Sequence, residues 1–217
     1  IGGIAKGSGM IHPNMATMLC FVTTDAAIAP ALLQKALKCV ADETFNMVSV
    51  DGDTSTNDML SILANGEAGN AEIVSMDADY YHFAQGLMMV CRQIAKELAA
   101  DGEGASKVAR IHVAGAASDA DAERVARTVG HSQLVKTALY GRDANWGRIV
   151  AAVGRSGADF NPDDVVVTLC GVELFRKGQP TDLDFDALLE EPLKQRDLPI
   201  DICLLYTSPS PRDRQKS

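Results

Sequence analysis

The sequence predicts an α/β fold, and two observations support this prediction. Short apolar runs bounded by turn residues, which are typical of strands, alternate with stretches whose apolar residues recur at helical spacing. The chain has 217 residues, of which 47% are hydrophobic, so it can bury a sizeable core. This length allows one domain, or one large domain with part of another.

The first half of the chain is predicted to hold three strands and two helices. The apolar run at 18–22 follows turn residues and contains no polar side chain, which indicates a strand buried on both faces. Pro30 is suited to the first turn of a helix, and Asp77 is suited to cap a longer one. The expected strands are 18–22, 47–50 and 59–63, and the expected helices run from 30 to 44 and from 77 to the glycine-rich run at 101.

The second half alternates in the same way. Ser118 and Asp121 form a cap for a helix that runs to 128, and Asn145 to Gly147 start another that runs to 153. The remaining expected elements are a strand at 108–114, two short strands at 165–171 and 172–179 that turn near Gly171, an amphipathic helix at 185–193, and a last strand from Pro199.

One stretch, Lys6 to Val22, carries the clearest sign of chemistry. A glycine-rich turn leads to Ala16 and Thr17, and the apolar strand follows directly. Thr17 therefore stands at the mouth of a strand, where a rigid scaffold can hold one hydroxyl group in a fixed position. The alternative is that Thr17 is an ordinary β-branched residue at the start of a strand.

The run KGSGMIHPNMATML, residues 6–19, resembles the autoprocessing segment of the ornithine acetyltransferases, the bifunctional glutamate N-acetyltransferases of arginine biosynthesis. The resemblance implies that the precursor cuts itself between Ala16 and Thr17 and that Thr17 becomes the catalytic nucleophile. A threonine hydroxyl is a weak nucleophile at neutral pH and needs a base to take its proton. The α-amine of a new N-terminus has an unperturbed pKa of about 7.7 to 8.0, so it can serve as that base.

Two charged residues are implied to bind substrate. Glu103 lies in DGEGASK, residues 101–107, and the matching glutamate of the family is a substrate-binding residue suited to an ammonium group. Lys6 is implied to bind a substrate carboxylate, and Thr17 belongs to the same substrate site. The alternatives are a solvated turn carboxylate and a solvated lysine.

Two further runs resemble the family, and we interpret both as scaffold around the site. In VDGDTSTND, residues 50–58, we expect the side chains mainly to bond their own backbone and shape the pocket. This run lacks the glycine and glutamate that an EF-hand requires, so no metal and no cofactor is predicted. LVKTA and GRDANWGRI, within residues 132–157, are the second part of the scaffold.

Charge and cysteine content exclude several classes of function. The net charge of −9 argues against nucleic acid and anionic membranes as partners. The five cysteines are scattered without a CxxC pair, which is typical of reduced thiols in a cytoplasmic protein. No apolar run approaches the length of a membrane span, about 20 residues.

The implied function is transfer of an acetyl group from N-acetylornithine to glutamate through an acetyl-threonine intermediate. Whether acetyl-CoA is also a donor stays open. The implied fold is a layered α/β sandwich in which the cut chains stay associated as a heterotetramer of two chain pairs. One alternative is an aminopeptidase or amidohydrolase of the same self-cleaving fold, and another is a non-catalytic structural domain.

The resemblance covers residues 1 to about 202, with expectations for the ends. We expect a nucleophile-bearing α/β domain at 1–160 and part of a smaller domain at 161–202. We also expect a non-native tail at 203–217, because CLLYTSPSPRD resembles a translated sequencing adapter, and the alternative is an ordinary disordered tail. The family's oxyanion-hole Thr-Gly pair is expected upstream in the first chain. Its C-terminal Asn and Ser or Thr have no match here. By itself the chain is therefore expected to be inactive.

Overall fold

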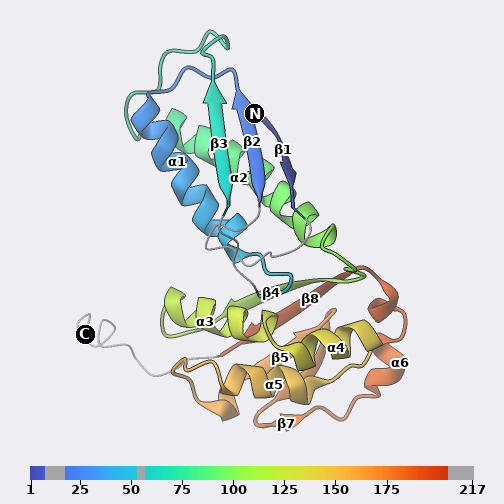
Figure 1. Cartoon of the computed structure of the whole chain (residues 1–217). Helices are drawn as coiled ribbons and strands as arrows, with labels where there is room; N and C mark the ends of the chain where they lie inside the picture. The colour runs from blue at the N-terminus through green and yellow to red at the C-terminus, as the bar shows by residue number, and fades with distance from the viewer. Residues whose placement is uncertain (8–17, 53–56, 205–217) are drawn as a thin grey trace, which may run out of the picture. The chain divides into compact units, whose positions relative to one another are not determined.

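The computed structural model describes residues 1–7, 18–52 and 57–204, which fall into two compact units divided between Ala105 and Ser106 (Figure 1). We had expected a division near 160. That position lies inside the second unit, because a strand at 108–114 and a strand at 197–203 pair in one sheet.

In the first unit, two helices cover one face of a sheet that, among the described residues, has the order β1-β2-β3. Strand β2 is antiparallel to β1 and parallel to β3. The elements are β1 (Gly2–Lys6), β2 (Leu19–Thr24), α1 (Pro30–Glu43), the 3-10 helix η1 (Phe45–Met47), β3 (Met59–Ala64) and α2 (Ala78–Ala100).

Both predicted helices of this unit are confirmed, together with their starting signals. Pro30 occupies the first turn of α1, where its missing N–H group costs no hydrogen bond. The Asp77 carboxylate caps α2 by accepting hydrogen bonds from the amides of Asp79 and Tyr80, at 3.1 and 3.3 Å. The helices then bury Val40, Leu87 and other apolar side chains against the sheet.

The prediction that the first strand is buried on both faces is wrong. Cys20 and Val22 are fully buried, whereas Leu19 and Phe21 are 39% and 42% exposed. An unbroken apolar run does not distinguish a strand covered on both faces from one whose apolar outer face is open, and the helices cover only one face. The strand predicted at 47–50 is also wrong, because η1 and irregular backbone occupy this segment.

In the second unit, helices pack on a sheet that has the order β4-β8-β5-β6-β7 within the described chain. Strands β4 and β8 are parallel, and the other pairs are antiparallel. The elements are β4 (Val108–Ala114), α3 (Asp119–Gly130), α4 (Gln133–Gly141), α5 (Trp146–Gly154), η2 (Pro162–Asp164), β5 (Val166–Leu169), β6 (Val172–Arg176), β7 (Gln179–Pro180), α6 (Phe185–Leu189), η3 (Pro192–Lys194) and β8 (Asp197–Cys203).

Most predicted elements of this unit are confirmed, but helix α6 is shorter than expected and helix α4 is additional. Strands β5 and β6 turn at Cys170 and Gly171, whose φ angles of 50° and 82° suit a tight hairpin. Helix α6 ends at Leu189, earlier than expected, because Pro192 cannot continue it and begins η3 instead. Helix α4 is an element that we did not predict separately.

The last strand reaches further than expected. Strand β8 lies between β4 and β5 and includes Cys203, which we had assigned to the tail. Leu204 is fully buried, and its amide donates a hydrogen bond of 2.9 Å to the carbonyl of Ala114. Cys203 and Leu204 are therefore part of the folded unit, and the rest of the predicted tail lies outside the described residues.

Candidate functional site

The predicted site residues differ in how far the structure describes them. Ala16 and Thr17 lie outside the described residues, and Met18 is the next described residue in the sequence. Lys6 is the last residue of β1, and Glu103 lies in the turn after α2. Both are exposed, and neither side chain forms a hydrogen bond or ion pair with another described residue.

The sheet of the first unit brings several of these positions to one end. Lys6 pairs with Leu19, and Leu19 pairs with Met59. Leu19 comes two residues after Thr17, and Met59 directly follows Asp58. Figure 1 shows β1 ending, and β2 and β3 beginning, at this same end.

Helix α2 brings the glutamate turn to the same end. A Cβ atom added to Gly86 would lie 3.4 Å from Cδ1 of Ile1. One added to Gly3 would lie 2.9 Å from Cδ1 of Ile94, one step further along both elements. Helix α2 therefore runs in the same direction as β1, and the turn that holds Glu103 follows its end.

The glutamate turn also packs closely on the segment that leads into VDGDTSTND. A Cβ atom added to Gly102 would lie only 2.8 Å from Cγ1 of Val50, so this position has no room for a side chain. Two predicted motifs are thus adjacent, although about fifty residues separate them in the sequence. One end of the first unit gathers Lys6, the residue after Thr17, and the flanks of both motifs.

Asp58 makes the most specific contact at this end. Its Oδ1 atom accepts a hydrogen bond of 2.8 Å from the amide of Met18, the residue after Thr17. Its Oδ2 atom is buried and has no hydrogen-bond partner among the described residues, as is also true of the hydroxyl group of Ser49. Burial raises the pKa of Asp58, and the hydrogen bond from Met18 opposes this rise in part.

Sequence reasoning did not single out Asp58. We had expected the VDGDTSTND side chains to bond their own backbone, whereas this carboxylate bonds an amide 40 residues away. The available signal was its place directly before the apolar run of β3. A strand that pairs with β2 brings the residue before it close to Met18.

The scaffold interpretation of GRDANWGRI agrees with its contacts in the second unit. Asn145 caps α5 by accepting a hydrogen bond of 3.1 Å from the amide of Arg148. The Arg148 side chain donates to the carbonyl of Leu134 and the hydroxyl of Thr137, both at 3.0 Å. Trp146 stacks on a phenylalanine of β6 with ring centroids 5.5 Å apart. These side chains are occupied in holding helices together.

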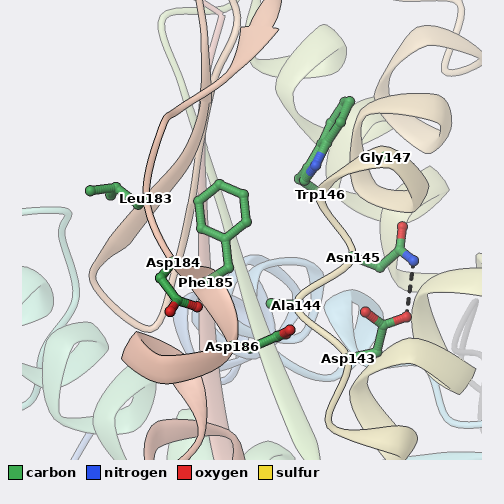
Figure 2. Close-up of a pocket in the computed structure, with 9 residues that line it drawn as sticks. All are labelled: Asp143, Ala144, Asn145, Trp146, Gly147, Leu183, Asp184, Phe185 and Asp186. Carbon is green, nitrogen blue, oxygen red and sulfur yellow. Dashed lines mark hydrogen bonds between the residues drawn. The ribbon is translucent and has the colours of Figure 1, made fainter.

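A cavity of about 460 Å³ lies in the second unit, lined by residues 143–147 and 183–186 (Figure 2). Figure 2 shows the Asp143 carboxylate accepting a hydrogen bond from the Asn145 amide, at 2.9 Å. Another lining carboxylate, Asp184, accepts from the amide of Ala187 at 3.1 Å and so caps α6. Two of its acidic groups thus serve local structure, and none of the predicted site residues lines this cavity.

The described part of the chain holds neither a cluster of metal ligands nor a membrane-spanning helix. No group of three or more His, Cys, Asp or Glu side chains within residues 1–7, 18–52 and 57–204 is placed to hold a metal ion. In the same residues, no helix is long and apolar enough to span a membrane.

Fold and site together define an α/β protein whose first unit gathers charged groups and a partly buried carboxylate at one end of a sheet that helices cover on one face. Comparison with known proteins identifies it further. The chain belongs to the ArgJ family, whose model matches residues 1–210. This finding confirms the resemblance to the enzymes of arginine biosynthesis that the sequence motifs indicated.

Individual relatives agree with this assignment. The arginine biosynthesis bifunctional protein ArgJ of Nitratidesulfovibrio vulgaris is 62% identical over 200 residues, which are 92% of this chain and 50% of the relative. The protein of the same name from Geobacillus kaustophilus is 51% identical over 180 residues, or 83% of this chain and 44% of the relative. The chain therefore spans about half the length of these relatives.

A solved structure confirms the fold. The crystal structure of the arginine biosynthesis bifunctional protein ArgJ from Bacillus halodurans superposes with a TM-score of 0.82 at 40% sequence identity. The match covers 85% of this chain and 87% of that chain. The predicted α/β class is thus correct.

Proposed function

We propose that this chain carries the nucleophile of an acetyltransferase of arginine biosynthesis. In this proposal, the precursor is cut between Ala16 and Thr17, and Thr17 then transfers acetyl groups from N-acetylornithine to glutamate. Support comes from family membership, from relatives named as bifunctional proteins of arginine biosynthesis, and from the segment at 6–19.

The chemistry proceeds in two stages that use the same hydroxyl group. In the precursor, the Thr17 hydroxyl attacks the Ala16 carbonyl, and the peptide C–N bond breaks, which moves the acyl group to oxygen and frees the α-amine. Water then hydrolyses this ester, which releases the Ala16 carboxylate and restores the hydroxyl group. The amine then takes the hydroxyl proton as Thr17 attacks the acetyl carbonyl of N-acetylornithine. Ornithine leaves with that proton, and the amino group of glutamate accepts the acetyl group from the threonine ester.

The observation that carries this proposal is the convergence at one end of the first unit. The side chains of Lys6 and Glu103 have opposite charges, and neither has a hydrogen-bond or ion-pair partner among the described residues. Amino-acid substrates carry both a carboxylate and an ammonium group, which a lysine and a glutamate can bind by charge-assisted hydrogen bonds. The backbone that follows Thr17 begins at the same end.

We further propose that the first chain of the precursor covers the open face of the sheet. This open face consists of apolar side chains from all three strands, and no helix among the described residues covers it. Its members are Ile4, Leu19, Phe21, Met59 and Leu63, which are 72%, 39%, 42%, 38% and 60% exposed. A contiguous apolar surface of this kind marks an interaction site.

The remaining parts of the proposal concern assembly and setting. Relatives about twice as long as this chain supply enough sequence for a first chain, and two such chain pairs form a heterotetramer. The cysteines in the described residues are free thiols, which fits the cytoplasm, where thiols stay reduced.

The test joins this chain to the upstream half of the Nitratidesulfovibrio vulgaris relative and measures intact masses and N-terminal sequences. We expect a new N-terminus at Thr17, absent from Thr17→Ala and retained in Thr17→Ser, which keeps a hydroxyl group. Equal cutting of Thr17→Ala would contradict the nucleophile assignment.

The cut protein is then assayed for acetyl transfer from N-acetylornithine to glutamate. Acetate release that does not depend on glutamate would indicate an amidohydrolase instead, and acetylation of glutamate from acetyl-CoA would add a second donor. Lys6→Ala and Glu103→Gln should each raise KM by roughly 10- to 100-fold through loss of a charged hydrogen bond.

A further inference from the structure

We infer that Asp58 is a positioning residue that holds the backbone directly after Thr17 through the amide of Met18. This inference rests on the proposed function, in which Thr17 is the nucleophile. It concerns a side chain that acts through a neighbouring peptide group and does not itself touch the substrate.

The geometry begins with the peptide bond that joins Thr17 to Met18. Its nitrogen donates a hydrogen bond of 2.8 Å to Oδ1 of Asp58. A peptide group is planar, and its plane includes the Cα atoms of both residues. A carboxylate that fixes the direction of this N–H group therefore orients the plane to which the Cα atom of Thr17 belongs.

Met18 is held on its other side as well. Its carbonyl accepts a hydrogen bond of 2.8 Å from the amide of Met59, the residue that directly follows Asp58. Its side chain is only 4% exposed and belongs to the core cluster of the first unit. The side chain of Asp58 and the backbone of Met59 thus hold both backbone polar groups of Met18, the residue directly before β2.

The carboxylate of Asp58 has no other described use. The Met18 amide is its one hydrogen-bond partner among the described residues, and its Oδ2 atom is buried without any. A buried polar oxygen without a partner costs stability, so such atoms call for an explanation. A charged acceptor makes a stronger hydrogen bond than a neutral one, which favours a role in fixing this particular amide.

A structural role alone predicts a different pattern from a positioning role. If Asp58 served only to stabilise the unit, cleavage after substitution would follow thermal stability. Asp58→Asn keeps an acceptor for the Met18 amide and removes the buried charge, so it should be at least as stable as the parent chain yet cleave more slowly. Asp58→Ala removes the acceptor altogether.

The experiment compares these two variants with the parent chain, each joined to the upstream half of the Nitratidesulfovibrio vulgaris relative. We expect cleavage between Ala16 and Thr17 to slow by roughly 10- to 100-fold in Asp58→Ala and by roughly 2- to 10-fold in Asp58→Asn. In the cut protein, kcat for acetyl transfer should fall in the same order, with KM for N-acetylornithine unchanged. Asp25→Asn is the matched control, because Asp25 is exposed just beyond the opposite end of β2.

Amide hydrogen exchange of Met18 supplies a readout that does not depend on catalysis. Protection of this amide should fall in Asp58→Ala and stay largely intact in Asp58→Asn. Cleavage at the parent rate in Asp58→Ala would overturn the inference. Asp58→Asn as slow as Asp58→Ala would also overturn it, because an acceptor for the amide would then be insufficient.

The failure of the proposed function has a different signature. If the parent chain stays uncut, or if Thr17→Ala is cut as fast as the parent, Thr17 is not the nucleophile and the role of Asp58 falls with it. If Thr17→Ala stays uncut while all Asp58 variants match the parent, the proposed function stands and only the inference about Asp58 is rejected.

Discussion

The outer faces of the two sheets differ in polarity between the two units of this chain. In the second unit the inner face buries Leu198 and Ile200 completely, while the outer face presents polar groups such as His112 and Asp201, whose side chains lie 3.5 Å apart. In the first unit the inner face is equally well buried, but the outer face exposes large apolar side chains on all three strands, from Ile4 of β1 to Leu63 of β3. Only the second sheet has a surface suited to water on its uncovered side.

This difference separates a unit whose core is complete from a unit that carries the candidate site. The second unit completes a core from its own described residues, and its family motifs serve as helix caps and braces. The first unit carries the converging charged residues and the Asp58 carboxylate, whose buried Oδ2 atom has no hydrogen-bond partner among the described residues. The proposed active site thus belongs to the unit that has a surface left to cover.

The largest expected effect comes from a pair of identical substitutions, one in each sheet. Leu198→Ala in the second unit should cost about 2–5 kcal/mol of stability, because this side chain is fully buried. Leu63→Ala on the open face should change the stability of the chain alone by no more than about 0.5 kcal/mol, since this side chain is 60% exposed. Denaturant unfolding measures both. A comparable loss in Leu63→Ala would show that the face is covered within the chain itself.

The next prediction concerns what covers the open face. Phe21→Asp places a charge at the centre of this surface and should weaken binding of the upstream half of the Nitratidesulfovibrio vulgaris relative by at least about 10-fold, since buried unpaired charge opposes association. Titration calorimetry gives the affinity. Tyr140→Asp is the control, because Tyr140 is 73% exposed on α4 of the second unit. Equal weakening by both variants would contradict a specific role for the open face.

A smaller effect should separate scaffold from site in the second unit. Asn145→Ala removes the cap of α5 and should cost about 0.5–2 kcal/mol of stability. In the cut and assembled enzyme, KM for N-acetylornithine should stay as in the parent. A rise in KM at unchanged stability would instead place Asn145 in contact with substrate.

The smallest expected effect is the pH dependence that Asp58 gives to the first unit. Its pKa is raised by burial, so the folded chain binds a proton more tightly than the unfolded chain, and stability is lost as the pH rises through the folded pKa. Asp58→Asn cannot ionise and should melt at a higher temperature than the parent at pH 7. The gap should close as the pH falls to about 4, near the ordinary carboxyl pKa. A gap that does not vary with pH would show that ionisation of Asp58 is not its source.

Several elements were predictable because their signals are local. Pro30 and Asp77 mark helix starts through backbone groups within one turn, and Gly171 marks a hairpin through its own φ angle. The burial of β2 was not predictable in this way, because its outer residues are as apolar as its inner ones. The segment at 47–50 was misjudged for a related reason, since a short apolar run has no distinctive period.

The residues of the candidate site also differ in whether a local signal or a long-range contact reveals them. Thr17, Lys6 and Glu103 were proposed from motifs, because residue type and order suffice to recognise a family. Asp58 was not, since its contact with Met18 depends on the parallel pairing of two strands whose partners lie 40 residues apart.

The sequence by itself determined the class of fold, the family and the caps that start most helices, because these depend on local side-chain chemistry and on residue order. The tertiary structure was needed to show which strand faces are covered, that β8 lies between β4 and β5, and that the Asp58 carboxylate accepts a hydrogen bond from the amide of Met18. Each of these depends on strand register and on helix placement between segments distant in sequence. A local pattern carries no record of such pairings.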